Sequence, residues 1–403
     1  MVESIKNLGI LDDTVSNVCK IRKMLILTSG GDAPGMNAVV RSVISSANSK
    51  GIEVFCVIDG YNGFIKGGSA FEKMSPNKVS NLMEKGGTAI YTPRKADGFL
   101  SVEGRNKAYD NCIKNGIDAV VVIGGDGTFR GANDFTVEHP DIPIIGIPAT
   151  IDGDITATDY TIGFDTAVNT VIECICALKD TNESHARCSV IEVMGRGAGY
   201  IALNAAIASG AIGAYIPEKK TEFDRVALVN KIVERKKQKV RNFTVVVSEG
   251  VNTKQPDNQR TVEKLNRKFK GPLSVALKTE ADVFFDELSE SLKKVLECRF
   301  VRPAHIIRGG SPTAKDRVTA AKMGNMAVEL LCSGDKNKVI CERDAALTTC
   351  SFDFAITVDE MYKKGKNSGL DKLSEAEKEV AIALVEQRKA EIDKLYNTFL
   401  NLA

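Results

Sequence analysis

The chain has 403 residues, more than one ordinary hydrophobic core requires, so we expect two domains. A net charge of +2 with 26% charged residues gives no electrostatic basis for binding nucleic acid or an anionic membrane. No apolar run is long enough to cross a bilayer, and the ten cysteines are scattered without a CxxC pair. We therefore expect reduced thiols, a cytoplasmic location, and partners other than nucleic acid or a membrane.

The first predicted element follows 22 polar, unpatterned residues. Residues 24–27 are a continuous apolar run, which predicts a strand buried on both faces of a parallel sheet. A glycine-rich turn follows, and apolar spacing over 38–49 then predicts a helix. Strand, turn and helix form the first arm of a doubly wound α/β unit, with the turn at the ligand-binding end of the sheet. The turn matches neither the Walker pattern nor GxGxxG, so the common nucleotide-binding folds are not indicated.

Two later strands, predicted at 119–123 and 143–147, end in the same kind of turn. Asp126 follows the first of them in the stretch GGDGT, and the second leads into a loop with Asp152 and Asp154. Right-handed crossovers place the loops that follow parallel strands on one edge of the sheet. We therefore expect the three carboxylates to converge.

Three carboxylates in one place need a compensating charge, because unpaired carboxylates repel each other or shift their pKa values. A Mg²⁺ ion that arrives with a phosphorylated ligand supplies that charge. Enzymes catalyse phosphoryl transfer mainly by positioning the reactants and neutralising their charge. Of the three carboxylates expected here, one would remain to take the proton of an acceptor hydroxyl. Any one of these turns alone is more simply an ordinary strand-to-helix turn. Three of them on one sheet edge favour a phosphate site.

Cations gather in several predicted loops and at strand ends. Arg94 and Lys95 lie in a loop of the first half, and the second half repeats the strand and helix rhythm with strands at 187–194 and 243–247. Arginine suits a phosphate monoester because of its bidentate fork, so we expect an anion pocket facing the glycine and aspartate loops. For any single arginine, a surface ion pair is the alternative. The cations in question are Arg187, Arg196, Arg299, Arg302, His305 and Arg308.

Two further stretches carry structural predictions. Residues 251–270 are polar and basic, which indicates an exposed excursion from the second half. Ser374 and Glu377 have the spacing of a capping box, and the apolar spacing after them predicts an amphipathic helix. We expect this C-terminal helix to pack on its own domain.

Seven motifs taken together resemble the 6-phosphofructokinase family. They are LTSGGDAPGMNAVVR (27–41), VVIGGDGT (121–128), TIDGD (150–154), TDYTIGFDTAV (158–168), SHARCSVIEVMGRGAG (184–199), SEG (248–250) and HIIRGGSPTAKDR (305–317). The resemblance implies an α/β fold of two doubly wound, three-layer Rossmann-like domains, with the active site in the cleft between them. It implies a nucleotide-binding domain of residues 1–163 plus 307–357. Residues 164–306 plus 358–403 would form the sugar-phosphate domain, including the C-terminal helix.

The family reaction implied is transfer of the γ-phosphoryl group of MgATP to the 1-hydroxyl of fructose 6-phosphate. By this resemblance Asp152 would be the general base, Arg196 would stabilise the transferring group, and Thr150 would contact the sugar phosphate. Asp126 and Asp154 would bind Mg²⁺. The residues implied to hold the nucleotide are Gly31, Arg94, Lys95, Gly125, Asp126, Gly127, Thr128 and Gly131. Those implied to bind the sugar phosphate are Thr150, Asp152, Asp154, Arg187, Met194, Gly195, Arg196, Glu249, Arg299, His305 and Arg308.

The resemblance also implies a homo-oligomer, by family habit a homotetramer. Arg187 and Arg299 would then reach the 6-phosphate of the sugar from a neighbouring subunit. Both residues would act across the interface between subunits.

The family divides between ATP users and pyrophosphate users, and two positions favour ATP here. Pyrophosphate users usually carry Asp where this chain has Gly127, and Lys where it has Ala149. Both residues are small, which leaves room for ATP. The alternatives are a pyrophosphate-dependent enzyme and a non-catalytic regulatory subunit of the same fold. Gly153 and Ile307, which replace the Asn and Gln that are usual in the family, motivate the second alternative.

Overall fold

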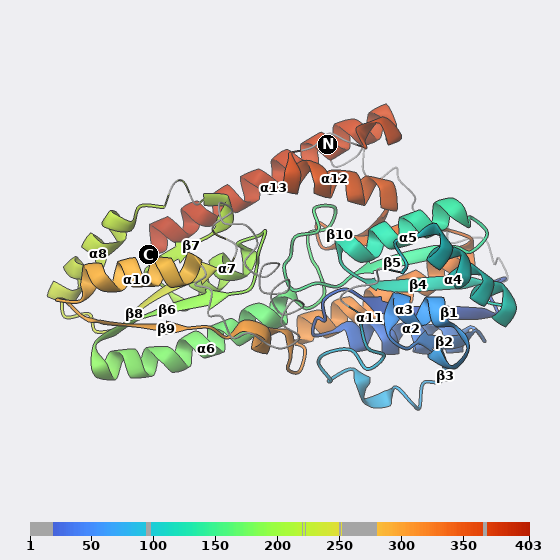
Figure 1. Ribbon diagram of the computed structural model, residues 1–403, viewed down its shortest axis with the longest axis horizontal. Coiled ribbons are helices and arrows are strands. Elements are labelled where there is room, and N and C mark those ends of the chain that lie inside the picture. Colours follow the sequence, from blue (N-terminus) through green and yellow to red (C-terminus); the bar gives the residue numbers. More distant parts are fainter. Residues whose placement is uncertain are drawn as a thin grey trace, which may run out of the picture.

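The protein is described from a computed structural model, over residues 19–93, 98–219, 221, 223–249, 251, 280–365 and 369–403. Figure 1 shows two α/β lobes side by side, each built on its own sheet. This arrangement confirms the predicted fold class.

The sheet of the first lobe has seven strands in the order β11-β10-β5-β4-β1-β2-β3. The inner strands pair in parallel, and the two edge strands, β3 and β11, are antiparallel to their neighbours. The strands are β1 (Lys23–Ser29), β2 (Glu53–Val57), β3 (Phe71–Met74), β4 (Ala119–Gly124), β5 (Ile144–Pro148), β10 (Lys338–Arg343) and β11 (Ala346–Ser351).

Helices cover both faces of this sheet, which explains why its central strands are apolar at every position. In β1, Met24 and Ile26 pack in one core cluster with helices α2 and α11. Leu25 and Leu27 point to the opposite face, into a second cluster with α3, α4, α5 and α12. These helices are α2 (Met36–Ser49), α3 (Gly60–Lys66), α4 (Val102–Asn115), α5 (Asp126–Glu138), α11 (Ala314–Ser333) and α12 (Phe352–Lys364).

The second lobe repeats the three-layer pattern on a parallel sheet of four strands in the order β7-β8-β6-β9. Its strands are β6 (Arg187–Val193), β7 (Gly213–Tyr215), β8 (Phe243–Ser248) and β9 (Glu297–Val301). Helices α6 and α7 pack on one face and α8 and α10 on the other. Their bounds are α6 (Phe164–His185), α7 (Tyr200–Ser209), α8 (Arg225–Lys237) and α10 (Glu280–Leu292). Short 3₁₀ turns are η1 (Gly68–Ala70), η2 (Ser80–Leu82), η3 (Pro217–Lys219), η4 (Ala304–Arg308) and η5 (Leu370–Lys372).

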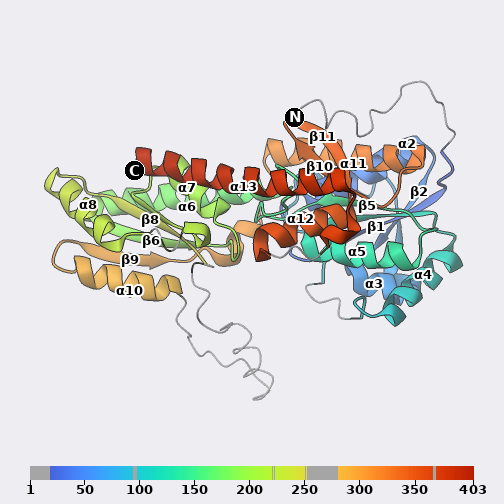
Figure 2. The same ribbon diagram turned by 90° about the horizontal axis from the view of Figure 1, so that it is seen from above.

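The C-terminal helix α13 (Glu375–Leu402) begins at the predicted capping box, in which Ser374 and Glu377 each accept from the other's backbone N–H. Figures 1 and 2 show that it runs across both lobes. Its first half packs on α12 through Leu384, and its second half packs on α7 through Ile392. The prediction that this helix packs on its own domain is therefore corrected, because its apolar face bridges the two lobes.

The predicted domain boundaries stay predictions. The boundary at 163 falls directly before α6, whereas the boundary at 357 falls inside α12, which packs on α5 in the first lobe. The predicted excursion at 251–270 lies outside the described residues, apart from Val251.

One prediction about the cysteines is wrong. Cys19, four residues before β1, forms a disulfide with Cys332 at the end of α11, with Cα atoms 4.4 Å apart. The two residues are separated by 313 positions in sequence and meet beside one core cluster, so the tertiary fold brings them together. Eight further cysteines are free thiols.

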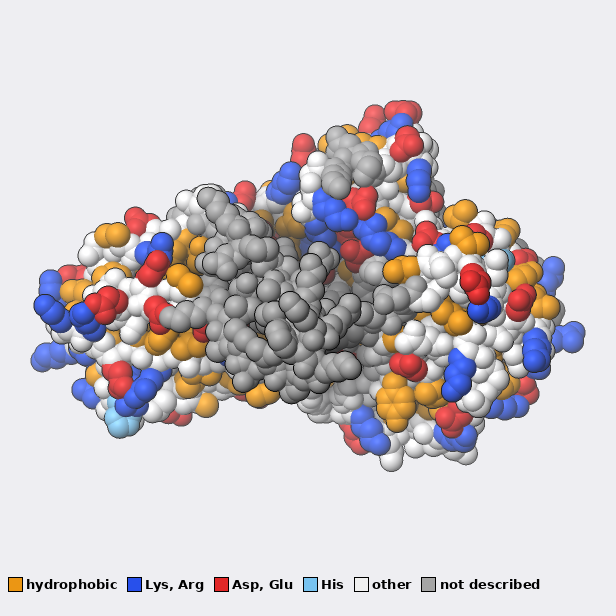
Figure 3. Space-filling view, in the orientation of Figure 1, with side chains coloured by type: hydrophobic (Ala, Val, Ile, Leu, Met, Phe, Trp, Pro, Cys, Tyr) orange, Lys and Arg blue, Asp and Glu red, His pale blue; other side chains and the backbone are white. Residues whose placement is uncertain are grey.

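Charged side chains of both signs share the surface. On the face shown in Figure 3, lysine and arginine side chains are interspersed with aspartate and glutamate over both lobes. Among the described helices, none combines the length and the apolarity that a membrane span needs.

Candidate active site

Three adjacent strands of the first lobe end together, as the sequence predicts. In the sheet register, Ser29 at the end of β1 lies opposite Gly124 of β4, which in turn lies opposite Pro148 of β5. The three glycine- and aspartate-containing turns therefore start from one edge of the sheet, at the carboxyl ends of its parallel strands. This is the edge at which α/β sheets bind ligands.

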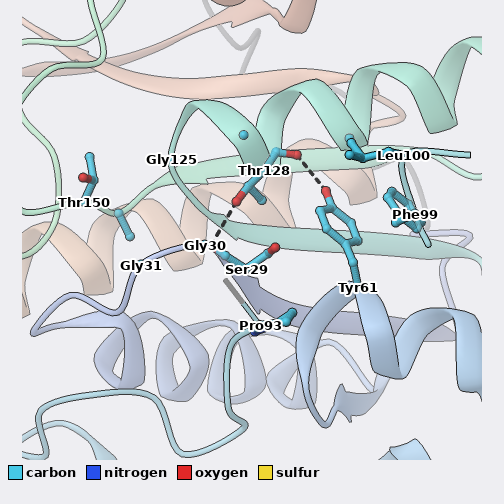
Figure 4. Close-up of a pocket in the computed structure, with 13 residues that line it drawn as sticks. Ser29, Gly30, Gly31, Tyr61, Pro93, Phe99, Leu100, Gly125, Thr128 and Thr150 are labelled. Atoms are coloured by element: carbon cyan, nitrogen blue, oxygen red, sulfur yellow. Dashed lines mark hydrogen bonds between the residues drawn. The ribbon is translucent and has the colours of Figure 1, made fainter. Parts of the chain in front are cut away.

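A pocket of about 300 Å³ opens at this edge. Its lining includes five of the residues predicted to hold the nucleotide: Gly31, Gly125, Gly127, Thr128 and Gly131. Figure 4 shows Thr150 and Gly31 at one end of the pocket, with Phe99 and Leu100 at the other.

The second end of the pocket is aromatic, which the sequence did not indicate. The rings of Tyr61 and Phe99 stack with centroids 4.0 Å apart. The Tyr61 hydroxyl donates to the carbonyl of Thr128 at 2.7 Å, and the Thr128 hydroxyl donates to the carbonyl of Ser29 at 2.9 Å (Figure 4). These two bonds fix the glycine-rich turn against α3 and β1. The pocket thus combines a polar end with an apolar, aromatic end.

Helix α5 begins at the polar end of the pocket. Gly125 is its N-cap residue and supplies no side chain, so the first backbone N–H groups of the helix are not capped by a side chain. The N-terminus of a helix attracts anions because its exposed N–H groups and its dipole both favour negative charge. A phosphate group in this pocket would therefore meet a positive backbone field.

Asp152 lies in the loop after β5, beside the pocket. Its backbone N–H donates to the Thr150 hydroxyl at 3.3 Å, which connects the predicted base to a residue that lines the pocket. Burial and the nearby Asp154 carboxylate raise the pKa of Asp152 to about 6. The positive charges of Arg308 and Lys363 limit this rise. A carboxylate with a pKa near neutrality is a suitable general base at physiological pH.

A lysine that the sequence did not single out lies among the acidic residues. Lys363 of α12 contacts Asp154 at 2.9 Å and Asp359 at 3.3 Å. Burial disfavours the charged form of Lys363, but the carboxylates of Asp359, Asp154 and Asp126 outweigh it and raise the pKa of the lysine. Asp152 and Asp154 therefore influence each other's charge, and Asp126 is within electrostatic range of the same lysine. Part of their compensating charge comes from the chain itself.

Asp126, the other predicted magnesium ligand, is also paired. Arg130, one turn further along α5, contacts Asp126 at 2.7 Å and Glu360 of α12 at 2.9 Å. Among the residues that the structure describes, no three acidic, histidine or cysteine side chains lie close enough to hold a metal ion on their own. Two carboxylates nonetheless suit Mg²⁺, which takes most of its remaining ligands from phosphates and water.

The second lobe contributes residues at the carboxyl ends of β6 and β8. Met194 and Gly195 are buried directly after β6, and Arg196 next to them is exposed. Glu249 follows β8, where its backbone N–H donates to Val193. Desolvation raises the pKa of Glu249, the Asp152 carboxylate adds to the rise, and the Arg308 guanidinium opposes it. The charges of Glu249, Asp152 and Arg308 are therefore within electrostatic range of one another.

Arg308 ends η4, which also carries the exposed His305, and it reaches back to the first lobe. Its Nη1 donates to the carbonyl of Asp32 at 3.1 Å. A Cβ on Gly31 would lie 2.9 Å from this Nη1, so glycine at this position gives the guanidinium its room. Ile307, one of the departures from the family motifs, is fully buried and serves the core.

Arg187 and Arg299 lie away from these residues. Arg187 starts β6, at the opposite end of the strand from Arg196. Arg187 contacts Glu297 at 2.5 Å, and Arg299 contacts the same carboxylate. Within one chain the structure does not bring Arg187 and Arg196 into one anion pocket. The predicted residues Arg94 and Lys95 lie outside the described residues.

The family is shown by comparison with known proteins. The phosphofructokinase family model matches residues 23–331. An ATP-dependent 6-phosphofructokinase of Halothermothrix orenii is 40% identical over 345 residues, covering 85% of this chain and 97% of that protein. The enzyme of the same name from Streptococcus uberis is 43% identical over 315 residues, covering 78% and 83%.

Solved structures agree with this assignment. Phosphofructokinase of Saccharomyces cerevisiae superposes with a TM-score of 0.76 at 31% identity, covering 94% of this chain and 50% of that chain. This chain therefore spans about half of the yeast chain. A pyrophosphate-dependent phosphofructokinase of Marinobacter aquaeolei, at 20% identity and a TM-score of 0.66, covers 82% and 83% and shows the fold alone. On these matches and the site geometry together, the chain belongs to the phosphofructokinase family.

Proposed function

We propose that this chain catalyses the ATP-dependent phosphorylation of the 1-hydroxyl of fructose 6-phosphate, which gives fructose 1,6-bisphosphate in glycolysis. One observation carries the proposal beyond the family match. Asp152, with its pKa raised to about 6, bonds to Thr150 at the donor pocket and lies in electrostatic range of Arg308 near the second lobe. A base between a phosphate pocket and a facing cation is what transfer to a sugar phosphate requires.

ATP is the proposed donor. Tyr61 and Phe99, whose rings stack, give the pocket an apolar end that would suit an adenine base, and pyrophosphate has no group to fill it. A Cβ on Gly127 would meet no atom within 4 Å, so the space beside the glycine-rich turn is open for the nucleotide phosphates. Ala149 is small and lines the same pocket. Gly31, Gly125, Thr128 and Gly131, with Arg94 and Lys95, complete the proposed nucleotide site.

In the proposed reaction, the Asp152 carboxylate accepts the proton of the sugar 1-hydroxyl as the oxygen attacks the γ-phosphorus of ATP. The bond from that phosphorus to the β–γ bridging oxygen breaks, and ADP leaves. Arg196 places positive charge beside the transferring group, and Thr150 helps hold the sugar phosphate against the donor. Asp126 and Asp154 are the proposed ligands of Mg²⁺, which would neutralise part of the phosphate charge when it is bound. The proposed sugar-phosphate site is completed by Asp154, Met194, Gly195, Glu249, His305 and Arg308.

We further propose that the enzyme is a homotetramer in which Arg187 and Arg299 reach the 6-phosphate site of a neighbouring subunit. Arg187 begins β6, and Arg299 lies in the middle of β9, opposite Ser189. Both arginines contact Glu297 in the half of the sheet away from Arg196, which supports this. The proposed location is the cytoplasm, the compartment of glycolysis. This location rests on the reaction alone. Reduced thiols no longer support it, because Cys19 and Cys332 form a disulfide.

The test of the proposed reaction compares the wild type with Asp152→Ser. We expect the wild type to form fructose 1,6-bisphosphate from ATP and fructose 6-phosphate with Mg²⁺. Asp152→Ser should bind fructose 6-phosphate nearly as well by calorimetry but lose about 10²–10⁴-fold in kcat, the usual contribution of a general base. An unchanged kcat would remove Asp152 from the role of base, and no product from the wild type would favour a regulatory subunit.

A further inference from the structure

The loop that carries the proposed base has no regular secondary structure to hold it. Residues 150–158, here called the base loop, run between β5 and α6 without forming helix or strand. Gly153, between Asp152 and Asp154, has φ of +64°, a left-handed conformation that glycine adopts at little cost. Side chains from elsewhere therefore help to fix the loop, including the peptide plane between Gly153 and Asp154 that follows the proposed base.

One arginine of the C-terminal helix bonds to two carbonyls of this loop. Nη2 of Arg388 donates to the carbonyl of Gly153 at 3.2 Å and to that of Thr158 at 3.0 Å. Its other terminal nitrogen, Nη1, donates to Glu391 at 3.1 Å. Arg388 is only 8% exposed, so these bonds form away from bulk water, where charge-assisted hydrogen bonds are strong.

The same guanidinium also contacts the second lobe. It lies over the ring of Tyr200, with its central carbon 5.3 Å from the ring centroid. Tyr200 is the first residue of α7 and follows directly on the loop that carries Arg196. Arg388 therefore touches the base loop of one lobe and the start of the helix behind the proposed phosphoryl-stabilising arginine of the other.

We propose that Arg388 is a positioning residue for the reaction: it fixes the base loop and ties that loop to the Arg196 side of the cleft. The role rests on the proposed function. It is separate from the family motifs, because Arg388 lies beyond residues 23–331 that the family model matches. Misplacing a reacting group by about 1 Å can cost about 10²-fold in rate, so loss of these bonds should affect kcat.

A purely structural role for Arg388 makes different predictions, and two control variants separate them. Ile392, one turn further along α13, is 3% exposed and packs in a core cluster, so Ile392→Ala removes packing of the same helix but leaves the hydrogen bonds of Arg388 in place. Lys389 is exposed beside Arg388, so Lys389→Met removes a charge from the same helix at its surface.

The experiment measures kcat, the KM for ATP, Tm and amide hydrogen exchange over 151–158 for Arg388→Met, Arg388→Lys and both controls. We expect Arg388→Met to lower kcat about 10²-fold with the KM for ATP within about twofold, and to speed exchange in the base loop. Millimolar guanidinium should restore part of its kcat. Ile392→Ala should lower Tm but keep kcat, Lys389→Met should change neither, and Arg388→Lys should retain part of kcat.

Two results would overturn the role of Arg388. The first is a kcat for folded Arg388→Met equal to that of Ile392→Ala, and the second is unchanged exchange over 151–158. If Arg388→Met does not fold, Arg388→Lys carries the same comparison, and wild-type kcat in that variant also contradicts the proposal. An inactive wild type would instead overturn the proposed function, and the exchange measurement would still decide whether Arg388 holds the loop.

Discussion

The Nζ atom of Lys363 lies 2.9 Å from Oδ2 of Asp154 and thus places a positive charge from α12 in the loop that carries the proposed base. The same lysine contacts Asp359, whose carboxylate accepts from the backbone N–H of Thr156 at 2.6 Å. One helix therefore holds the loop by a cation at Asp154 and by an anion at Thr156. The lysine therefore neutralises part of the negative charge of Asp154 and Asp359.

Removal of Lys363 should destabilise the fold. In Lys363→Met, the Asp359 side chain, which is 3% exposed, stays buried but loses its positively charged partner. Breaking a buried ion pair by removing one partner costs about 3 kcal/mol of folding stability. The free energy of unfolding by urea measures this loss. The matched control is Lys364→Met, which breaks an exposed pair with Glu360 on the same helix and should cost about 0.5 kcal/mol or less. Equal effects of the two variants would contradict a special role for Lys363.

The raised pKa of Asp152 predicts a pH dependence of activity. Because the base must be deprotonated, kcat/KM of the wild type should fall about tenfold for each pH unit below about 6. Initial rates between pH 5 and 8 at constant ionic strength measure this. A profile that stays flat to pH 5 would show that the base titrates at a lower pH or is another residue.

The same shift predicts a pH dependence of stability. The pKa of Asp152 rises on folding from 3.8 to about 6, so the folded state binds more protons than the unfolded state between these values. The wild type should therefore lose stability as the pH rises through this window, and stay at the lower level above pH 6. Asp152→Asn removes the titration, so its Tm should exceed that of the wild type at pH 7.5. The difference should disappear towards pH 4, and a difference independent of pH would contradict the shift.

The open space at Gly127 predicts how donor binding can be weakened without unfolding the protein. A Cβ at this position meets no atom within 4 Å, and the position stands in the first turn of α5, where a negative charge is tolerated. Gly127→Asp should raise the KM for ATP by about tenfold through repulsion of the phosphates, at nearly unchanged Tm. Gly127→Asn, which has the same shape without the charge, should raise it less. An unchanged KM in Gly127→Asp would place the phosphates elsewhere.

The proposed action of Arg299 across a subunit interface can be tested with mixed oligomers. Arg299→Ala should raise the KM for fructose 6-phosphate far more than it lowers kcat, and Asp152→Ser should be nearly inactive. Co-expressed subunits of the two variants should recover about a quarter of wild-type sites, since some sites combine an intact Asp152 with an intact Arg299 of a neighbour. If Arg299 served its own chain, each site would keep one defect and the mixture would recover nothing.

Much of the fold follows from local patterns. The strands β1, β4 and β5 are continuous apolar runs because both faces of the sheet are covered, and the turns after them are rich in glycine at the ligand edge. The capping box at Ser374 is equally local, and the helix starts there. Such features depend on residues close in sequence, so the sequence alone predicts them.

The features that the sequence did not predict depend on contacts between distant segments. Lys363 and Arg388 lie on amphipathic helices, where a cation usually belongs to the solvated face, and only the packing of α12 and α13 brings them to the base loop. Tyr61 and Phe99 come from separate segments that meet only in the folded pocket. The Cys19–Cys332 disulfide joins residues 313 positions apart, which no spacing rule connects.

The most direct test of the central claim is the choice of phosphoryl donor. Formation of fructose 1,6-bisphosphate from fructose 6-phosphate and Mg²⁺ is measured with ATP and with pyrophosphate in parallel, using one enzyme preparation. We predict product with ATP and none with pyrophosphate, as the aromatic end of the pocket and the small residues Gly127 and Ala149 require. Product with pyrophosphate alone would contradict the proposed donor, and no product with either donor would contradict the proposed reaction.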